Sequence, residues 1–456
     1  MHNDLRDYLK HIQDRFPDEI LEIPHPVSPD FEITAYALEL DKLPAPPILL
    51  FKNIHGFQSP VVANLFASPK RLARIFGTKP ETLTTGWLSF AHRRIKPKVV
   101  SSAPVKDIIK TGNAIDLGEF PIPTHFSNDA GRYITAGVIF AKDPITHVGN
   151  MSFARLQVMQ KNTLGTSLHS RGDLWRYHQK QEELECGLEV AIAVGVHPAI
   201  SIAAATQLPP DEDELDLAGG ILDSPVEVIK AETVDLFVPA SAEMIIEGII
   251  EPKIRVDEGP FGEYTGYASA RSTRNLLTVT AVTHRKDMIF QDITPGYSKD
   301  HLNLSKISRV PRVFEALRRS FSNVTNIHYP HSGTHYHCYV SIHNPLPGQA
   351  KQVLAMLFGL DMYLKLVIIV DDDIDVTNEQ EVLWAVATRF QADRDTILLE
   401  GVVCNLLDPS AENGLSAKLG IDATFSPNKK IEKTQLPESI VAEVKKTLEA
   451  LLINRS

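Results

Sequence analysis

The spacing of hydrophobic and polar positions first indicates a small α/β unit. Residues 48–51 form a short apolar run that is typical of a strand, and residues 61–76 repeat apolar positions at helical intervals. The apolar positions of this expected helix are Val62, Leu65, Phe66, Leu72 and Ile75.

From about residue 105 to residue 293 the spacing changes to alternating or β-branched runs, which indicate strands. The clearest runs are residues 135–140, 226–229, 244–250 and 277–282. A longer stretch, residues 190–205, is almost continuously apolar but is broken by Gly195, His197 and Pro198. It is too short to span a bilayer, so we interpret it as a core strand. The middle third is therefore expected to be mainly sheet or barrel.

Beyond residue 305, helical and strand signals alternate as they do in α/β domains. The expected elements are helices over residues 310–320, 349–358 and 381–388, and strands over residues 338–342 and 366–370. A final helix over residues 437–453 has one apolar face, which requires a cover. Two covers remain open: the helix's own domain, or a second subunit. The pattern as a whole divides the chain into residues 1–104, 105–305 and 306–456.

Composition and charge narrow the class of protein. A length of 456 residues suggests about three domains, and 43% hydrophobic with 23% charged residues is typical of globular chains. The net charge of −11 and the scattered cationic residues argue against a nucleic-acid partner. Three cysteines are too few for a disulfide framework, and the N-terminus lacks the apolar stretch of a signal peptide. We therefore expect a cytoplasmic protein without a membrane span.

Residues 257–267 (DEGPFGEYTGY) contain the first candidate chemistry. Glu258 and Glu263 lie five residues apart, and the intervening Gly-Pro-Phe-Gly indicates a tight turn that could direct both carboxylates into one cavity. In an apolar pocket, one such carboxyl group could have a raised pKa and act as a general acid. Alternatively, both are solvated acids of a surface turn.

Residues 150–155 (NMSFAR) are the second candidate. In an extended chain Arg155 and Asn150 face opposite sides, so that the arginine could reach a pocket while the asparagine offers an amide oxygen to a cation. A surface ion pair is the alternative role of Arg155. The third candidate is the acidic run at residues 211–214, where Glu214 together with Asn150 would suit magnesium or manganese. An acidic helix cap is the alternative there.

These three segments together resemble the UbiD family of reversible decarboxylases. Residues 150–155 are similar to the family's Asn-x-x-x-x-Arg segment, and residues 258–263 to its Glu-Gly-Pro-[Phe/Tyr]-Gly-[Glu/Asp] turn. Glu214 matches the metal-binding glutamate of the family, and residues 416–424 resemble its Ser-Lys-x-Gly-[Leu/Ile]-Asp-Ala-Thr segment. The resemblance extends from about residue 43 to residue 424.

The resemblance implies a fold and a set of ligands. The fold is α/β (α+β), with a central split β-barrel that binds flavin between an N-terminal α/β domain and a C-terminal α/β oligomerisation domain. The implied cofactors are prenylated FMN and Mn²⁺ or Mg²⁺, with K⁺ as a further candidate. The implied metal ligands are Asn150, Glu214 and Asp173. Asp173 lies at a position where some members of the family have a histidine ligand and others have no ligand. The implied cofactor contacts are Asn150, Ser152, Phe153, Ala154, Arg155, Arg171, Gly172, Asp173 and Glu214.

The implied reaction is the reversible, non-oxidative decarboxylation of an aromatic, heteroaromatic or α,β-unsaturated acid. By analogy, the substrate adds to the cofactor, CO₂ leaves, Glu263 protonates the carbon, and Glu258 holds Arg155. A carbanion on an sp² carbon requires an electron sink that no side chain provides, which agrees with a modified flavin. The implied partners are a flavin prenyltransferase and further copies of the chain, as a homodimer or higher oligomer. A plain FMN-dependent oxidoreductase and a catalytically silent flavin-binding subunit remain alternatives.

Three further signals are assigned no chemistry. The histidines at 328, 331, 335 and 337 fit no standard zinc spacing, so we expect a surface or pocket-rim role for them. The acids at residues 371–375 follow an apolar strand and are expected to be structural. His301 either faces substrate or is an ordinary loop histidine.

Overall fold

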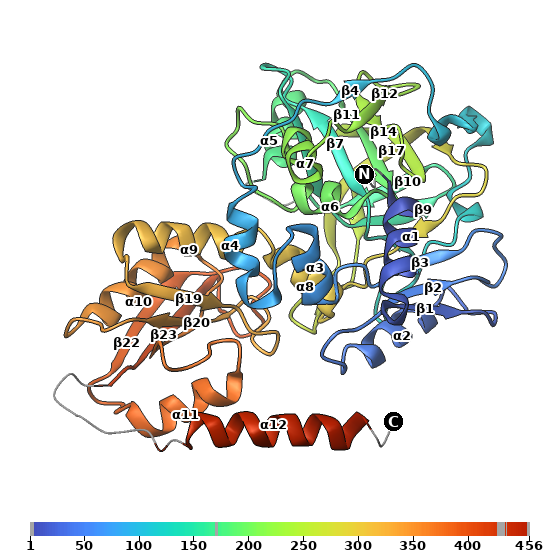
Figure 1. Cartoon of the computed structure of the whole chain (residues 1–456). Helices are drawn as coiled ribbons and strands as arrows, with labels where there is room; N and C mark the ends of the chain where they lie inside the picture. The colour runs from blue at the N-terminus through green and yellow to red at the C-terminus, as the bar shows by residue number, and fades with distance from the viewer. Residues whose placement is uncertain (1–3, 169–171, 426–433, 435, 454–456) are drawn as a thin grey trace.

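A computed structural model describes residues 4–168, 172–425, 434 and 436–453. The chain forms a mixed α/β structure in which a curled sheet lies above an N-terminal layer, with a C-terminal α/β unit to the side of that layer (Figure 1). This is the expected fold class. The domain boundaries at residues 104 and 305 stay a proposal, because β18, just before the second boundary, pairs with β3 of the N-terminal sheet.

The N-terminal layer is a four-stranded sheet in the order β1-β2-β3-β18, with helices packed around it. Helix α1 begins after Asp4, whose side chain accepts the Asp7 N–H at 2.7 Å, and it buries Leu5, Leu9 and Ile12 at helical spacing. The elements are α1 (Leu5–Arg15), β1 (Ile20–Ile23), α2 (Glu32–Leu40), β2 (Ile48–Phe51), β3 (Val61–Ala63), α3 (Pro69–Ile75), α4 (Leu83–Leu88) and β18 (Phe290–Gln291).

The central sheet has nine strands in the order β6-β9-β10-β17-β14-β11-β7-β8, with β5 paired to β17. Its long strands β14 and β17 pair antiparallel, and its apolar side chains form two buried clusters. Its strands are β5 (Ile108–Thr111), β6 (Tyr133–Ile134), β7 (Val138–Lys142), β8 (Gly149–Phe153), β9 (Leu156–Gln160), β10 (Thr163–Thr166), β11 (Leu188–Val194), β14 (Met244–Glu258) and β17 (Ser272–His284). A separate three-stranded sheet contains β4 (Lys98–Val99), β12 (Glu227–Lys230) and β13 (Phe237–Pro239). A two-stranded hairpin is formed by β15 (Phe261–Gly262) and β16 (Ala268–Ser269). The helices are α5 (Asp173–Glu183), α6 (Pro198–Ala204), α7 (Glu214–Leu222) and α8 (Lys299–Lys306).

The C-terminal unit is a five-stranded sheet in the order β19-β20-β21-β23-β22. Helices α9 and α10 pack on it, and α9 also contacts α4 of the N-terminal layer (Figure 1). The elements are α9 (Arg309–Ser320), β19 (Val324–His328), β20 (His337–Ile342), α10 (Gln349–Leu360), β21 (Leu366–Asp371), α11 (Glu379–Arg389), β22 (Thr396–Val403), β23 (Leu415–Ala423) and α12 (Glu438–Ile453).

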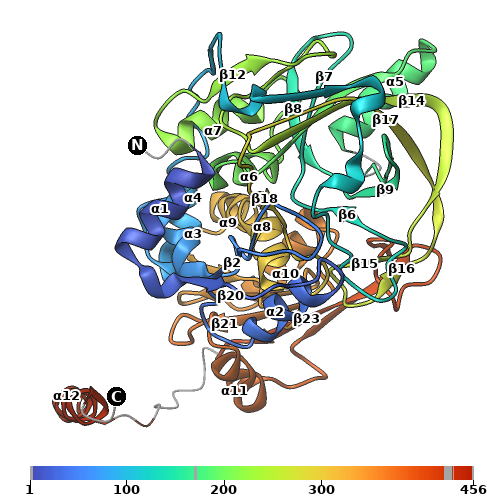
Figure 2. The same cartoon turned by 90° about the vertical axis from the view of Figure 1, so that its right-hand side faces the viewer.

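Helix α12 stands apart from the sheets in both views (Figures 1 and 2). Four of its apolar side chains are about half exposed: Ile440, Val444, Leu448 and Leu451. The described part of the chain therefore leaves this face uncovered, and a second subunit as its cover stays a prediction. No helix among the described residues combines the length and the apolar character that a membrane span requires.

Two expected elements are wrong. Residues 61–76 are not one helix: the β-branched start forms β3 between β2 and β18, and α3 begins only at Pro69, which suits a first helical turn. Residues 190–205 are not one strand either. Strand β11 ends at Val194, Gly195 turns with φ of +74°, and Pro198 begins the fully buried helix α6, whose first turn is capped by His197.

Candidate active site

One arginine and two glutamates from distant segments meet at one end of the curled sheet. The Arg155 guanidinium donates from Nε and Nη2 to the two carboxylate oxygens of Glu258, at 2.7 and 2.8 Å. Its Nη1 donates to Oε1 of Glu263. All three side chains are largely buried, and Glu258 is fully so. The two candidate carboxylates therefore share one guanidinium instead of lying on a solvated surface turn.

Local structure brings these groups together. Arg155 lies in the connection between β8 and β9, and Glu258 ends β14. Gly259 then turns the chain with φ of +84°, a backbone conformation that favours glycine. The β15–β16 hairpin follows, and it lies on the side of the barrel that contacts the C-terminal unit (Figure 2). Glu263 leaves β15 at that point.

Glu263 and Arg155 both have a raised pKa, but for different reasons. Burial raises the pKa of Glu263, although the Arg155 charge works against the shift and the Glu258 charge adds to it. Burial also opposes the charged form of Arg155, but hydrogen bonds to Glu258 and the Glu263 charge outweigh it and raise the pKa of Arg155. The site thus combines a permanent cation with a carboxyl group whose raised pKa suits it to act as a proton donor.

Asn150 and Glu214 form a second polar pair. Glu214 opens helix α7, and its Oε2 accepts the Met151 N–H at 2.8 Å and the Asn150 Nδ2 at 3.3 Å. Burial raises the pKa of Glu214 to about 8. Asn150 Oδ1 and Ser152 Oγ are buried without a hydrogen-bond partner in the described part of the chain. Buried oxygens without donors are what a hard cation or a phosphate-bound ion would satisfy.

The metal itself is not established by this geometry. Among the described residues, no group of three or more His, Cys, Asp or Glu side chains is arranged to hold an ion. Asp173 begins α5 and forms an ion pair with Arg176, and Gly172 is the N-cap of the same helix. Arg171 lies outside the described residues. Asp173 as a third ligand therefore stays a prediction.

The remaining predicted contacts lie on the strand that leads to Arg155. Ser152 and Phe153 end β8, and Ala154 follows in the connection to β9. This segment thus joins the Asn150–Glu214 pair to the Arg155 cluster over five residues, so that one ligand could span both. Whether these residues contact a cofactor stays a prediction.

The histidines expected at the surface or a pocket rim include one that is nearly fully buried. His335 is 4% exposed, and its ring lies 4.6 Å from that of Tyr264, the residue after Glu263. The Tyr264 hydroxyl is 3.2 Å from that of Tyr336 in the C-terminal unit. His301 approaches the Gly296 carbonyl at 3.2 Å. These contacts place the C-terminal unit directly beside the Glu263 hairpin.

Sequence reasoning missed the residues that hold this hairpin. Gln157 accepts the Gly259 N–H at 3.1 Å, and Asp129 accepts the Gly262 N–H at 2.8 Å. Gln157 lies two positions after Arg155, so the two-residue period of a strand could have placed both side chains on one face. Asp129 lies in a loop and has no such signal.

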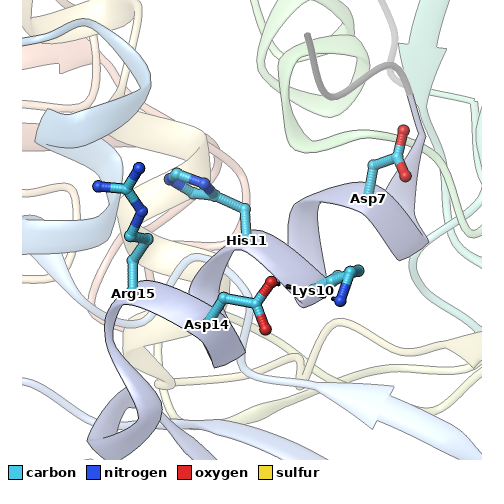
Figure 3. Close-up of a pocket in the computed structure, with 5 residues that line it drawn as sticks. All are labelled: Asp7, Lys10, His11, Asp14 and Arg15. Carbon is cyan, nitrogen blue, oxygen red and sulfur yellow. Dashed lines mark ion pairs between the residues drawn. The ribbon is translucent and has the colours of Figure 1, made fainter.

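A separate hollow lies on the outer face of α1 (Figure 3). Its lining comes from this one helix and mixes charges, including a Lys10–Asp14 ion pair at 3.3 Å. It contains none of the residues of the Arg155 cluster. We therefore assign the chemistry to that cluster alone.

Known proteins of the same architecture were found by comparison. Residues 14–89, 98–298 and 302–423 match the N-terminal, Rift-related and C-terminal domain models of 3-octaprenyl-4-hydroxybenzoate carboxy-lyase (UbiD). An uncharacterized protein of Aquifex aeolicus is 33% identical over 99% of this chain and 98% of its own length.

Solved structures agree. The UbiD-class enzyme HmfF from Pelotomaculum thermopropionicum in complex with FMN superposes with a TM-score of 0.90 at 36% identity, covering 95% of this chain and 97% of its own. An evolved dimeric form of that enzyme was solved with prFMN. Apo 3,4-dihydroxybenzoic acid decarboxylase (AroY) of Klebsiella pneumoniae gives a TM-score of 0.88 at 26% identity, covering 97% and 99%. With matches to all three domains and an architecture shared along nearly its whole length, this chain belongs to the UbiD family of carboxy-lyases.

Proposed function

We propose that this protein uses prenylated FMN to decarboxylate, reversibly and without net oxidation, an aromatic, heteroaromatic or α,β-unsaturated carboxylic acid. The observation that carries the proposal is the buried Arg155 guanidinium shared by Glu258 and Glu263. A fixed cation beside a protonatable carboxyl group suits a reaction in which a carboxylate leaves and a proton replaces it. The prFMN complex of the HmfF relative supports the choice of cofactor.

The residues present fit a flavin phosphate and its cation. Asn150 Oδ1, Ser152 Oγ and the Glu214 carboxylate offer oxygen ligands of the kind that Mn²⁺ or Mg²⁺ prefers. Because burial holds the pKa of Glu214 at about 8, a bound cation would favour its ionised form. Asp173 and a further K⁺ are secondary parts of this proposal. When bound, the prenylated ring would accept the electron pair that the departing CO₂ leaves behind.

The protein's own groups would then position and protonate the substrate. Arg155, held by both oxygens of Glu258, would orient the substrate carboxylate without itself moving. Glu263 would donate its proton to the carbon that lost the carboxyl group, which is possible because burial raises its pKa. Burial of the cluster keeps water from competing with these contacts.

The test compares Glu263→Gln with wild type, both co-expressed with a flavin prenyltransferase. A panel of heteroaromatic, phenolic and acrylic acids is screened for CO₂ release and for deuterium exchange into the product. We expect wild type to act on at least one acid and Glu263→Gln to be about 100-fold slower or worse. Glu227→Gln, an exposed glutamate of β12 paired with Lys98, is the matched control and should behave as wild type.

Three outcomes would contradict the proposal. Equal rates for Glu263→Gln and wild type would remove the acid role from Glu263. Unmodified FMN in the protein, together with consumption of a nicotinamide reductant, would instead identify an oxidoreductase. Bound cofactor without any exchange or CO₂ release would identify a silent flavin-binding subunit.

A further inference from the structure

A loop of the central domain grips the turn that carries Glu263. Asp129 Oδ1 accepts the Gly262 N–H at 2.8 Å, and the Ala130 N–H donates to the Pro260 carbonyl at 2.9 Å. Asp129 Oδ2 accepts the Phe126 N–H at 2.9 Å, which closes the loop on itself. The Gly262 N–H and the Pro260 carbonyl, both in the turn that precedes Glu263, are therefore hydrogen-bonded to residues 129–130.

Strand β9, which directly follows Arg155, also forms a hydrogen bond to the turn that carries Glu263. Gln157 Oε1 accepts both the Gly259 N–H and the Tyr133 hydroxyl, each at 3.1 Å. Tyr133 is fully buried and its ring lies 4.6 Å from that of Phe261. Strand β9 thus also fixes the start of the turn that presents Glu263.

The base of the loop is anchored in the core. Both His125 Nε2 and the Thr135 hydroxyl contact Asp292 Oδ1, at 3.0 and 2.8 Å, and His125 and Asp292 are almost completely buried. Directly after His125, Phe126 packs so tightly on Gly262 that a Cβ there would lie 2.3 Å from its ring. A loop fixed at its base and in contact at its tip can hold the turn rigidly.

We propose that Asp129 is a positioning residue that keeps the Glu263 carboxyl group in reach of Arg155 and of the reacting carbon. The inference rests on the proposed function and adds a residue to it. Glu263 directly follows Gly262, so release of the Gly262 N–H would let the side chain drift. The backbone of Glu263 itself donates its N–H to the Tyr267 carbonyl and accepts the Gly266 N–H, each at 2.9 Å. Both bonds lie within the hairpin and cannot fix the hairpin to the barrel.

The experiment compares Asp129→Ala with Asp116→Ala. Asp116 accepts the same kind of bond, from the Gly118 N–H at 2.9 Å, but in a 3₁₀ turn with no hydrogen bond or ion pair to the described residues of the Glu263 hairpin. The first readout is hydrogen–deuterium exchange of the peptide spanning residues 258–264 in the cofactor-free protein, which needs no activity. The second is kcat and KM of the cofactor-loaded enzyme on the acid that wild type prefers.

We expect Asp129→Ala to exchange at least about tenfold faster in this peptide and to lose about tenfold or more in kcat, with KM within about threefold of wild type. Asp129→Asn keeps an acceptor oxygen for the Gly262 N–H but turns its amide NH₂ toward the Phe126 N–H, so it should recover part of the loss. Asp116→Ala should match wild type in both readouts. Unchanged exchange, or faster exchange with wild-type kcat, would overturn the inference. If wild type acts on no acid, the proposed function fails, and the exchange arm still decides whether Asp129 holds the turn.

Discussion

Replacing Glu258 by glutamine tests how the three charges work together. The change removes one negative charge from a fully buried position and leaves the side-chain shape intact. Arg155 would lose its bidentate carboxylate partner and would keep Glu263 as its remaining carboxylate partner among the described side chains. Breaking a buried pair by removing one partner costs about 3–5 kcal/mol, and the surviving Glu263 contact favours the lower end of that range.

The same change should lower the pKa of Glu263. At present burial raises that pKa, Arg155 opposes the shift, and the Glu258 charge adds to it. In Glu258→Gln the repulsion disappears and the Arg155 charge acts on Glu263 alone, so the carboxylate form gains. A gain of about 1.4 kcal/mol corresponds to about one pKa unit.

The assay is the pH profile of kcat for decarboxylation. If Glu263 must be protonated, activity falls as pH rises through its pKa, so the alkaline limb of Glu258→Gln should lie at lower pH than that of wild type. Glu227→Gln should leave the limb in place. A limb that stays where it is or moves to higher pH would refute the coupling between the two glutamates, even if the overall rate fell.

Three further predictions follow from other parts of the molecule. Glu214→Gln should weaken Mn²⁺ binding to the FMN-loaded protein by about tenfold or more in calorimetric titration, because a predicted carboxylate ligand loses its charge. Burial raises the pKa of Asp300 from 3.8 to about 7, so its contribution to stability is fully present below pH 3.8 and is lost as pH rises from there to about 7. Asp300→Asn should remove about 4 kcal/mol of that pH dependence in urea unfolding. Leu448→Glu, on the exposed face of α12, should reduce the oligomer measured by light scattering if a second subunit covers that face.

Much of the architecture could be predicted from spacing alone. The expected helices and strands after residue 305 correspond to α9, β20, α10, β21 and α11, with ends that agree to within two residues. The helices α9, α10 and α11 have one buried face each, so the hydrophobic period reports their type directly. The strands β20 and β21 are buried on both faces and show instead as short apolar runs. The period is lost where a segment is buried on all sides. Residues 190–205 contain a strand and a helix that are both almost entirely buried, and an unbroken apolar run cannot distinguish them.

The prediction of a single helix over residues 61–76 is wrong for a different reason. Their apolar positions satisfy a helical template, but the partners of Val61 and Val62 are β2 and β18, and β18 lies more than 200 residues further along the chain. Pairing with so distant a strand overrides the local preference for a helix, and a short stretch of sequence contains no signal of that pairing. The helix that does form begins where Pro69 permits it.

The candidate site divides along the same line. Glu258 and Glu263 could be connected to each other because a short turn joins them, and Arg155 could be given a direction because strands alternate. Asp129 could not be found in this way, since it acts by accepting a backbone N–H, a group that every residue except proline carries. A sequence records which side chains are present but not which backbone amides need a hydrogen-bond partner. The residues that hold a catalytic turn can therefore be identified only from the three-dimensional structure of the turn. That is why the strongest untested role in this protein belongs to a loop aspartate, and why its test measures amide exchange as well as turnover.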